Sequence, residues 1–338
     1  MSRDAPVTTT DYLEGRWLPW PTPWEELFAR AAPLWMEIGF GNGEFLLNLA
    51  TAYPDVNVLG VEISRPSLRK AARKARNRGL SNVRVLYATA QQVLWLLCRP
   101  QALDAVFINF PDPWPKAAHH HRRLINERFL HLLATRTEPG AQLEVATDHA
   151  EYAQVIAAAL QASPYFEGDT TTPYVTEDGQ RIRTKYERIA LEEGRICHYF
   201  HWQRNDVAAI NAFPISEEFS MPHVILASSL SLQALQDRFE PATYTEHGLA
   251  VRFIGVFRSQ EHEALLLDTY VEEEPLAQRI GITIRRRKEG QYVLGLHEMG
   301  FPRPTEGVHS ALDYLVQHVR RMDPDLRILQ SNLRATDR

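Results

Sequence analysis

The chain has 338 residues, of which 44% are hydrophobic and 23% are charged, and its formal net charge is −5. This composition is typical of a globular protein with a packed core, and it excludes a disordered, collagen-like or disulfide-scaffold protein. The length suits two domains. Taken alone, the negative charge argues against a nucleic-acid partner, because Lys and Arg side chains bind phosphates.

Two cysteines, Cys98 and Cys197, stand far apart in the sequence and form no CxxC pair. They suit a reducing cytosol and offer no metal framework, so we expect a cytoplasmic protein without a metal site. The N-terminus has no hydrophobic signal region. Because no apolar run approaches the roughly 18 residues of a membrane span, we expect no membrane association.

Residues 1–33 are rich in Pro and Trp and predict an irregular N-terminal arm that leads into a short helix. From residue 34, short apolar runs alternate with helical patterns, which is typical of βαβ units in a parallel sheet covered by helices on both faces. The predicted helices are 43–53, 64–78, 89–97, 123–135 and 149–162. The predicted strands are 34–38, 56–62, 83–87, 104–110 and 141–147, followed by 184–192 and 195–203, which would close the sheet.

The pattern changes after about residue 205, where runs of strands lead to one late amphipathic helix over 305–322. Such an order indicates a separate α+β domain. The fold class is therefore α/β, with a first domain over residues 34–205 and a second, smaller α+β domain over residues 206–338. The strands predicted in the second domain are 222–228, 249–258, 264–272, 280–287 and 291–297.

The first predicted strand, 34–38, carries Glu37 near its end and runs into a turn that contains Gly39, Gly41 and Gly43. Glycines let backbone N–H groups approach a ligand closely, but this spacing does not match the dinucleotide pattern GxGxxG. Glu37 and Glu44 would repel a pyrophosphate, whereas they suit a cationic ligand such as S-adenosyl-L-methionine (SAM). A plain tight turn is the alternative interpretation.

Glu62 ends the second strand, where a carboxylate can accept hydrogen bonds from both ribose hydroxyls of a nucleoside. The alternative is a solvated glutamate at a strand end. Together with the glycine turn, Glu62 favours a Rossmann-like class I SAM-dependent methyltransferase domain, with NAD as the second choice of cofactor.

Strand 104–110 leads into the loop NFPDPWPK at residues 109–116. Its three prolines stiffen the loop, and the carboxyl end of a central strand is where open α/β sheets bind ligands. A purely structural turn would not need an aromatic ring, a carboxylate and a lysine together. We therefore interpret this loop as the acceptor site, with Trp114 either stacking on a base or packing in the protein.

The motifs EIGFGNGEF, LGVEISR, FINFPDPWPK with HHHRRL, VATDHAEY and TKYE make residues 34–204 resemble the bacterial tRNA (guanine-N7-)-methyltransferases. The resemblance implies transfer of a methyl group from SAM to N7 of a guanine in tRNA, usually guanine 46 of the variable loop. No counterpart of the segment from about residue 206 onward is recognised in that family.

The resemblance also implies roles for individual residues. Asp112 is expected to be catalytic, and Glu37, Glu62 and the three glycines to bind the cofactor. Thr89 stands where members of the family often have Asp or Asn, and its hydroxyl could bond the adenine of SAM. The residues expected to contact the substrate are Lys116, Arg122, Asp148, Thr184, Lys185, Tyr186 and Glu187.

The expected chemistry needs orientation more than proton transfer. Guanine N7 has an in-plane lone pair and no proton, so the enzyme must mainly hold it in line with the methyl group. Asp112 or Asp148 could accept hydrogen bonds from guanine N1–H and N2–H₂ while stabilising the positive charge that develops on the ring. The sequence leaves both assignments open.

The basic residues gather in short segments. Residues 65–78 contain seven Arg or Lys and no acid; Leu68, Ala71, Ala72 and Ala75 should face the core, leaving Arg69, Arg73 and Arg76 as a basic stripe. A second cluster comprises Lys116 and residues 119–123. Residues 1–205 hold 23 basic and 23 acidic residues, whereas residues 206–338 hold 14 and 19, so the net charge of −5 does not exclude RNA.

Several alternatives stay open at this stage. The acceptor could be another RNA or a small molecule, or the chain could be a non-catalytic RNA-binding protein that keeps a SAM-like pocket. The run of basic residues at 285–288 could contact RNA or protect a sheet edge. The second domain could support dimerisation or steady the tRNA, so a monomer and a homodimer are both open.

Overall fold

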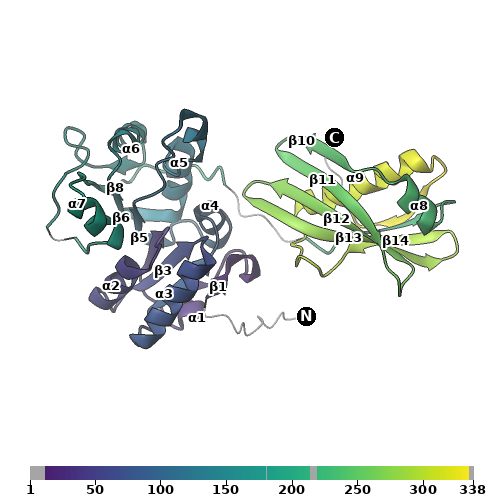
Figure 1. The fold of residues 1–338 in the computed structure, drawn as a ribbon, viewed down its shortest axis with the longest axis horizontal. Helices are drawn as coiled ribbons and strands as arrows, with labels where there is room; N and C mark the ends of the chain where they lie inside the picture. Colours follow the sequence, from purple (N-terminus) through teal and green to yellow (C-terminus); the bar gives the residue numbers. More distant parts are fainter. Residues whose placement is uncertain (1–11, 180, 214–218, 335–338) are drawn as a thin grey trace. The chain divides into compact units, whose positions relative to one another are not determined.

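The computed structural model describes residues 12–179, 181–213 and 219–334. The chain divides into two compact units, Met1–Ile215 and Ser216–Arg338. Each is built around its own sheet (Figure 1). None of the helices in these described ranges is long and apolar enough to cross a membrane.

The sheet of the first unit has eight strands in the order β1-β4-β3-β2-β5-β6-β8-β7 among the described residues. The pairs from β1 to β6 are parallel, whereas β8 runs antiparallel to β6 and to β7. The predicted strands over residues 34–147 are confirmed, as is the strand predicted at 195–203. The bounds are β1 (Leu13–Glu14), β2 (Leu34–Ile38), β3 (Asn57–Glu62), β4 (Val83–Tyr87), β5 (Leu103–Asn109), β6 (Thr137–Thr147), β7 (Phe166–Glu167) and β8 (His198–Arg204).

The prediction of a strand at 184–192 is wrong, because this segment forms helix α7 (Lys185–Glu192). Thr184 Oγ1 accepts a hydrogen bond from Glu187 N, and the Glu187 carboxylate accepts one from Thr184 N. This capping box satisfies two backbone donors at the start of the helix and so favours the helical state. The other helical elements of the unit are η1 (Gly15–Trp17), α1 (Trp24–Phe28), α2 (Glu44–Ala52), α3 (Arg65–Asn77), α4 (Ala90–Gln92), η2 (Val93–Leu97), η3 (Ala117–Arg122), α5 (Glu127–Arg136) and α6 (Ala150–Ala162).

Helix α3 has the two faces that its sequence predicts. The Ser64 side chain caps its first turn by accepting from Ser67 N. The apolar face, Leu68, Ala71, Ala72 and Ala75, is buried. The side chains of Arg69, Arg73 and Arg76 lie on the exposed face.

Residues 206–213, which the sequence analysis assigns to the second domain, pack on the first unit. The Arg136 guanidinium is fully buried and donates to Phe213 O at 2.5 Å and to Asn211 Oδ1 at 3.2 Å. Phe213 also packs edge-on against Trp95, with ring centroids 5.0 Å apart. These contacts place the segment with the sheet that precedes it.

The second unit is an antiparallel sheet in the order β10-β11-β12-β13-β14-β9-β15, packed against α8 and α9 (Figure 1). The five predicted strands and the late helix are confirmed. The sequence analysis missed β10, β15 and α8; both strands are only five residues long, lie at the edges of the sheet and contain no fully buried residue. The bounds are β9 (His223–Ala227), α8 (Leu232–Arg238), β10 (Ala242–Glu246), β11 (Leu249–Arg258), β12 (Ala264–Glu273), β13 (Leu276–Lys288), β14 (Gln291–Leu296), α9 (Glu306–Met322) and β15 (Arg327–Ser331).

Candidate active site

The glycine loop lies between the carboxyl end of β2 and the start of α2. Gly39, Gly41 and Gly43 all have positive φ angles, +73°, +54° and +73°, which favour glycine. A Cβ added to Gly43 would lie 2.7 Å from the Ala71 Cβ, so this glycine allows α3 to pack closely. A Cβ added to Gly39 would meet no atom within 4 Å. The loop is therefore tight on its α3 side and open beside Gly39, where a ligand could approach.

Glu62, at the end of β3, holds this loop in place. Its Oε2 accepts a hydrogen bond from Gly41 N at 3.0 Å. Its Oε1 accepts from Ile63 N at 2.8 Å and from Ser64 N at 2.9 Å. Three backbone donors already bond to this carboxylate, and only Oε2 has one lone pair left. Glu62 can therefore accept from one ribose hydroxyl, rather than from both as predicted.

Glu37, near the end of β2, has a buried carboxyl group, one oxygen of which has no hydrogen-bond partner among the described residues. Its side chain is 1% exposed, and Asn109 Nδ2 donates to its Oε1 at 2.9 Å. Its Oε2 is buried and has no hydrogen-bond partner among the described residues. Burial raises the pKa of Glu37 to about 8, although Asn109 and the positive charge of Arg181 oppose the rise. A cationic ligand near this oxygen would compensate the buried charge.

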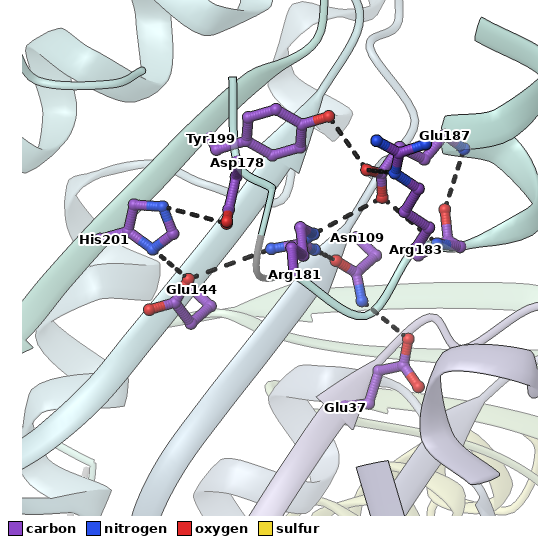
Figure 2. A network of polar contacts seen from close by, with 10 residues as sticks. Glu37, Asn109, Glu144, Asp178, Arg181, Arg183, Glu187, Tyr199 and His201 are labelled. Carbon is purple, nitrogen blue, oxygen red and sulfur yellow. Dashed lines mark hydrogen bonds and ion pairs between the residues drawn. The ribbon is translucent and has the colours of Figure 1, made fainter. Parts of the chain in front are cut away.

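A network of polar contacts extends from Glu37 across the sheet (Figure 2). The Arg181 guanidinium, 5% exposed, donates to Asn109 Oδ1, and Asn109 in turn donates to Glu37. Arg181 also lies 3.6 Å from a Glu187 carboxylate oxygen and 4.0 Å from one of Glu144. The network thus joins the carboxyl ends of β2 and β5 to helix α7.

Helix α7 places the TKYE segment on the glycine loop. Thr184 and Glu187 are buried in the capping box, and Tyr199 Oη donates to the Glu187 carboxylate at 3.0 Å. Lys185 and Tyr186 are exposed, and the Tyr186 ring lies 3.4 Å from the position of a Cβ on Gly41. All four residues of this segment are predicted to contact the substrate; of these, Lys185 and Tyr186 are accessible, whereas Thr184 and Glu187 shape the helix.

The acceptor loop is held in an unusual backbone conformation. Phe110 and Trp114 precede prolines and have φ angles of +52° and +42°, a region that non-glycine residues rarely adopt and that stores strain. The buried Arg123 side chain donates from Nε to Pro113 O at 2.8 Å and from Nη2 to Glu151 at 2.8 Å. This contact fixes the loop, and Asp112 projects from it as an exposed carboxylate.

The other four predicted site residues are Lys116, Arg122, Asp148 and Thr89. Lys116 and Arg122 are exposed, and the Arg122 guanidinium lies 4.9 Å from the centre of the Trp114 ring, so Trp114 packs against a cation in this structure. Asp148, which follows β6, forms an ion pair with Arg195. Thr89 Oγ1 accepts from Gln92 N at 3.2 Å as the cap of α4, so its oxygen is already engaged.

The sequence analysis assigned no individual role to Arg181 or to Asn109. Asn109 stood only as the first residue of the NFPDPWPK loop. Arg181 stands in a segment without regular structure, and nothing in its spacing distinguishes it from the neighbouring Arg183. Within the part of the chain that the structure describes, no group of three or more His, Cys, Asp or Glu side chains could hold a metal ion.

The glycine loop, the carboxylates that end β2 and β3, and the parallel sheet beneath them define a methyltransferase of the Rossmann-like fold. The family described as "Putative methyltransferase" matches residues 31–199, half of the chain. A protein of Thermus thermophilus named tRNA (guanine-N(7)-)-methyltransferase is 35% identical over 304 residues, which cover 89% of this chain and 93% of that protein. The chain therefore belongs to the tRNA (guanine-N(7)-)-methyltransferase family, and it is an enzyme.

Two other relatives of the same name match a shorter region. The protein of Halorhodospira halophila is 42% identical over 174 residues, covering 51% of this chain and 75% of its own. That of Alkalilimnicola ehrlichii is 36% identical over 186 residues, covering 55% and 78%. The Thermus match leaves out only about a tenth of this chain, so it must include most of the second unit, Ser216–Arg338. That unit therefore has a counterpart in the family. Because the chain belongs to a family of enzymes, the alternative of a non-catalytic RNA-binding protein is excluded.

Proposed function

We propose that this enzyme transfers a methyl group from S-adenosyl-L-methionine to N7 of a guanine in tRNA, at guanine 46 of the variable loop. The names of the relatives support the reaction and the substrate class. The observation that supports the cofactor best is the buried, unpartnered Oε2 of Glu37 beneath an open glycine loop. We also propose that the enzyme acts in the cytoplasm, on the tRNA pool there.

The residues present fit this cofactor. SAM, when bound, supplies an electrophilic methyl group on a sulfonium and adds an ammonium group. Glu37 would face one of these positive charges, and a nearby cation favours the ionised form of a carboxyl group. The spare lone pair on Glu62 Oε2 can accept a ribose hydroxyl. Beside Gly39, no atom of the described residues lies within 4 Å of the position that a Cβ would take, which leaves room for a ligand.

The chain's own contribution to the reaction is mainly to orient the base. Guanine N7 forms its bond to the methyl carbon as the carbon–sulfur bond breaks, and the purine becomes cationic without losing a proton. Asp112 is accessible on a fixed loop, so it can accept from the N1–H and N2–H₂ of guanine and stabilise the new positive charge. Asp148 is neutralised by Arg195, which favours Asp112 for this role.

The exposed basic side chains of α3 and of the acceptor loop supply a surface for the tRNA backbone. Lys74 on α3 donates from Nζ to Asn42 O of the glycine loop at 3.1 Å, so the stripe of Arg69, Arg73 and Arg76 runs beside the cofactor site. Lys116 and Arg122 follow Asp112 along the chain. Exposed positive charges beside the cofactor site and in the acceptor loop suit a polyanionic substrate.

The decisive experiment uses purified enzyme, unmodified tRNA and methyl-labelled SAM. We expect label in the tRNA, chain cleavage specific for N7-methylguanosine at position 46, and no label in a transcript that has adenine there. Label at another guanine would correct the position, and label only in a different RNA would replace tRNA as the substrate. No transfer to any RNA would refute the proposed function.

A further inference from the structure

The side chain of Arg181 connects two parts of the site that are far apart in the sequence. Glu37, Phe107, Glu144 and His201 occupy one register row across β2, β5, β6 and β8, so they share a face of the sheet. The segment before α7 crosses this face and inserts Arg181 over it, between the rings of Phe45 and Tyr199. The guanidinium carbon lies 5.4 Å and 5.5 Å from the two ring centres.

The contact between Arg181 and Asn109 fixes which way the Asn109 amide points. A carboxamide has a donor end and an acceptor end, and the two orientations fill the same space. Arg181 has only donors, so it holds the Asn109 oxygen and leaves the Nδ2 donor facing Glu37 at 2.9 Å. The opposite orientation would place an amide oxygen against the Glu37 carboxylate, which only a protonated Glu37 could tolerate.

The same guanidinium also faces Glu187, whose other contacts build the first turn of α7. Arg181 Nε lies 3.6 Å from Glu187 Oε2, and that oxygen accepts from Thr184 N at 3.2 Å. Glu187 Oε1 accepts from Tyr199 Oη at 3.0 Å. A buried carboxylate with these partners sets the direction of the helix that presents Lys185 and Tyr186 beside the glycine loop.

We propose that Arg181 is a positioning residue that couples the cofactor carboxylate, Glu37, to the substrate-facing start of helix α7. It acts through Asn109 on one side and through Glu187 on the other. The inference rests on the proposed function, because it assumes that Glu37 faces a cationic cofactor. Its consequence is that cofactor and tRNA strengthen each other's binding, since both favour the same arrangement of one guanidinium.

The charge around Glu37 gives this inference a measurable signature. The groups that face Glu37 are Asn109 from β5, the backbone N–H of Leu46 from α2, Arg181 from the segment before α7, and Glu62 from β3. Arg181 is the cation among them, and Glu62 acts in the opposite direction. Loss of Arg181 therefore raises the pKa of Glu37 further and reduces the ionised fraction that can bind a cation.

The test compares Arg181→Gln with Arg183→Gln in the full-length enzyme. Arg183 belongs to the same segment and also lies 4.0 Å from Glu187, but its side chain is 56% exposed, so its replacement is a matched loss of charge at the exposed rim of the network (Figure 2). The affinity for SAM and for S-adenosylhomocysteine is measured by calorimetry across pH, with and without tRNA. Circular dichroism and thermal melting confirm that each variant is folded.

In the wild-type enzyme and in Arg183→Gln, cofactor affinity should rise with pH up to about pH 8, where Glu37 becomes ionised. In Arg181→Gln this midpoint should move upward by about one pH unit, which weakens binding about tenfold below it. The strengthening of cofactor binding by tRNA should disappear in Arg181→Gln alone.

An unchanged midpoint together with unchanged coupling in Arg181→Gln would overturn the inference, whereas a wild-type enzyme that does not bind SAM would overturn the proposed function instead. If Arg181→Gln does not fold, Arg181→Lys serves in its place. Lysine keeps the charge and loses the planar fork that orients Asn109. It should keep the midpoint close to that of the wild type and still lose the coupling, and retention of the coupling would contradict the proposed role.

Discussion

Arg188 on α7 and Glu44 at the first position of α2 form an ion pair across the glycine loop. Arg188 Nη2 lies 2.7 Å from Glu44 Oε1 and 2.8 Å from Oε2, and the two residues are 144 positions apart. The pair holds the TKYE helix against the segment where we place the cofactor. Glu44 also stands at the positive end of the α2 dipole, which favours its ionised form.

Replacing Arg188 should therefore affect activity more than stability. The Arg188 side chain is 43% exposed and that of Glu44 27%, and ion pairs of this kind contribute about 0–1 kcal/mol. The hydrogen bond from Arg188 lowers the pKa of Glu44, so this small stabilisation is present at neutral pH and is lost as the pH falls through the lowered pKa. We expect Arg188→Gln to leave the melting temperature nearly unchanged while it raises the KM for tRNA. A large drop in melting temperature would show that the pair has a structural role instead.

Glu37→Gln should stabilise the cofactor-free protein at high pH while it weakens cofactor binding. Burial raises the pKa of Glu37 to about 8 from its ordinary value, so the folded state binds more protons and loses stability as the pH rises towards that value. Glutamine fills the same space and is never ionised. The melting temperature of the variant should exceed that of the wild type at about pH 9, and the difference should shrink at about pH 6. Added SAM should raise the melting temperature of the wild type only.

Much of this fold follows from local sequence patterns. Strands β2, β3 and β5 are mainly apolar, as expected for strands covered on both faces. Helix α7 was missed because its capping box, Thr184 with Glu187, competes with a pattern that also suits a strand. The edge strands β10 and β15 were missed because each has only five residues, none of them fully buried, so the pattern is too short to distinguish a strand.

The candidate site could be predicted only in part. Two carboxylates, Glu37 and Glu62, lie at strand ends, and Asp112 lies in a proline-rich loop. Such positions can be recognised from the order of neighbouring residues in a single sequence. Arg181 meets Asn109 only through the tertiary fold, across 72 positions of the chain. A single sequence records no such pairing. The same holds for the ion pair of Asp148 with Arg195, which shifts the expected catalytic role towards Asp112.

Asp112→Ala should strongly slow methyl transfer and leave the fold and the cofactor affinity intact. The Asp112 carboxylate is exposed on a loop that Arg123 holds through Pro113 O, so its removal leaves no buried group unpaired. Loss of an interaction made with the developing charge costs roughly 10²–10³ in kcat. Single-turnover rates and SAM affinity separate the two effects. Asp148→Ala is the comparison: because Arg195 already neutralises Asp148, it should lower the rate less, and the reverse order would exchange the two roles.

The basic stripe of α3 should determine how tRNA binding depends on salt. Arg69 and Arg73 are exposed one turn apart on the same face, beside the glycine loop that Lys74 contacts. Each phosphate contact contributes about −0.9 to the slope of log affinity against log salt concentration, so Arg69→Gln with Arg73→Gln should reduce that slope by about 2. Arg99→Gln is the control. Arg99 is exposed near the amino end of β5, whereas the site lies at the carboxyl ends of the strands. Equal slopes for the wild type and the double variant would mean that α3 is a solvated face and that the tRNA backbone is bound elsewhere.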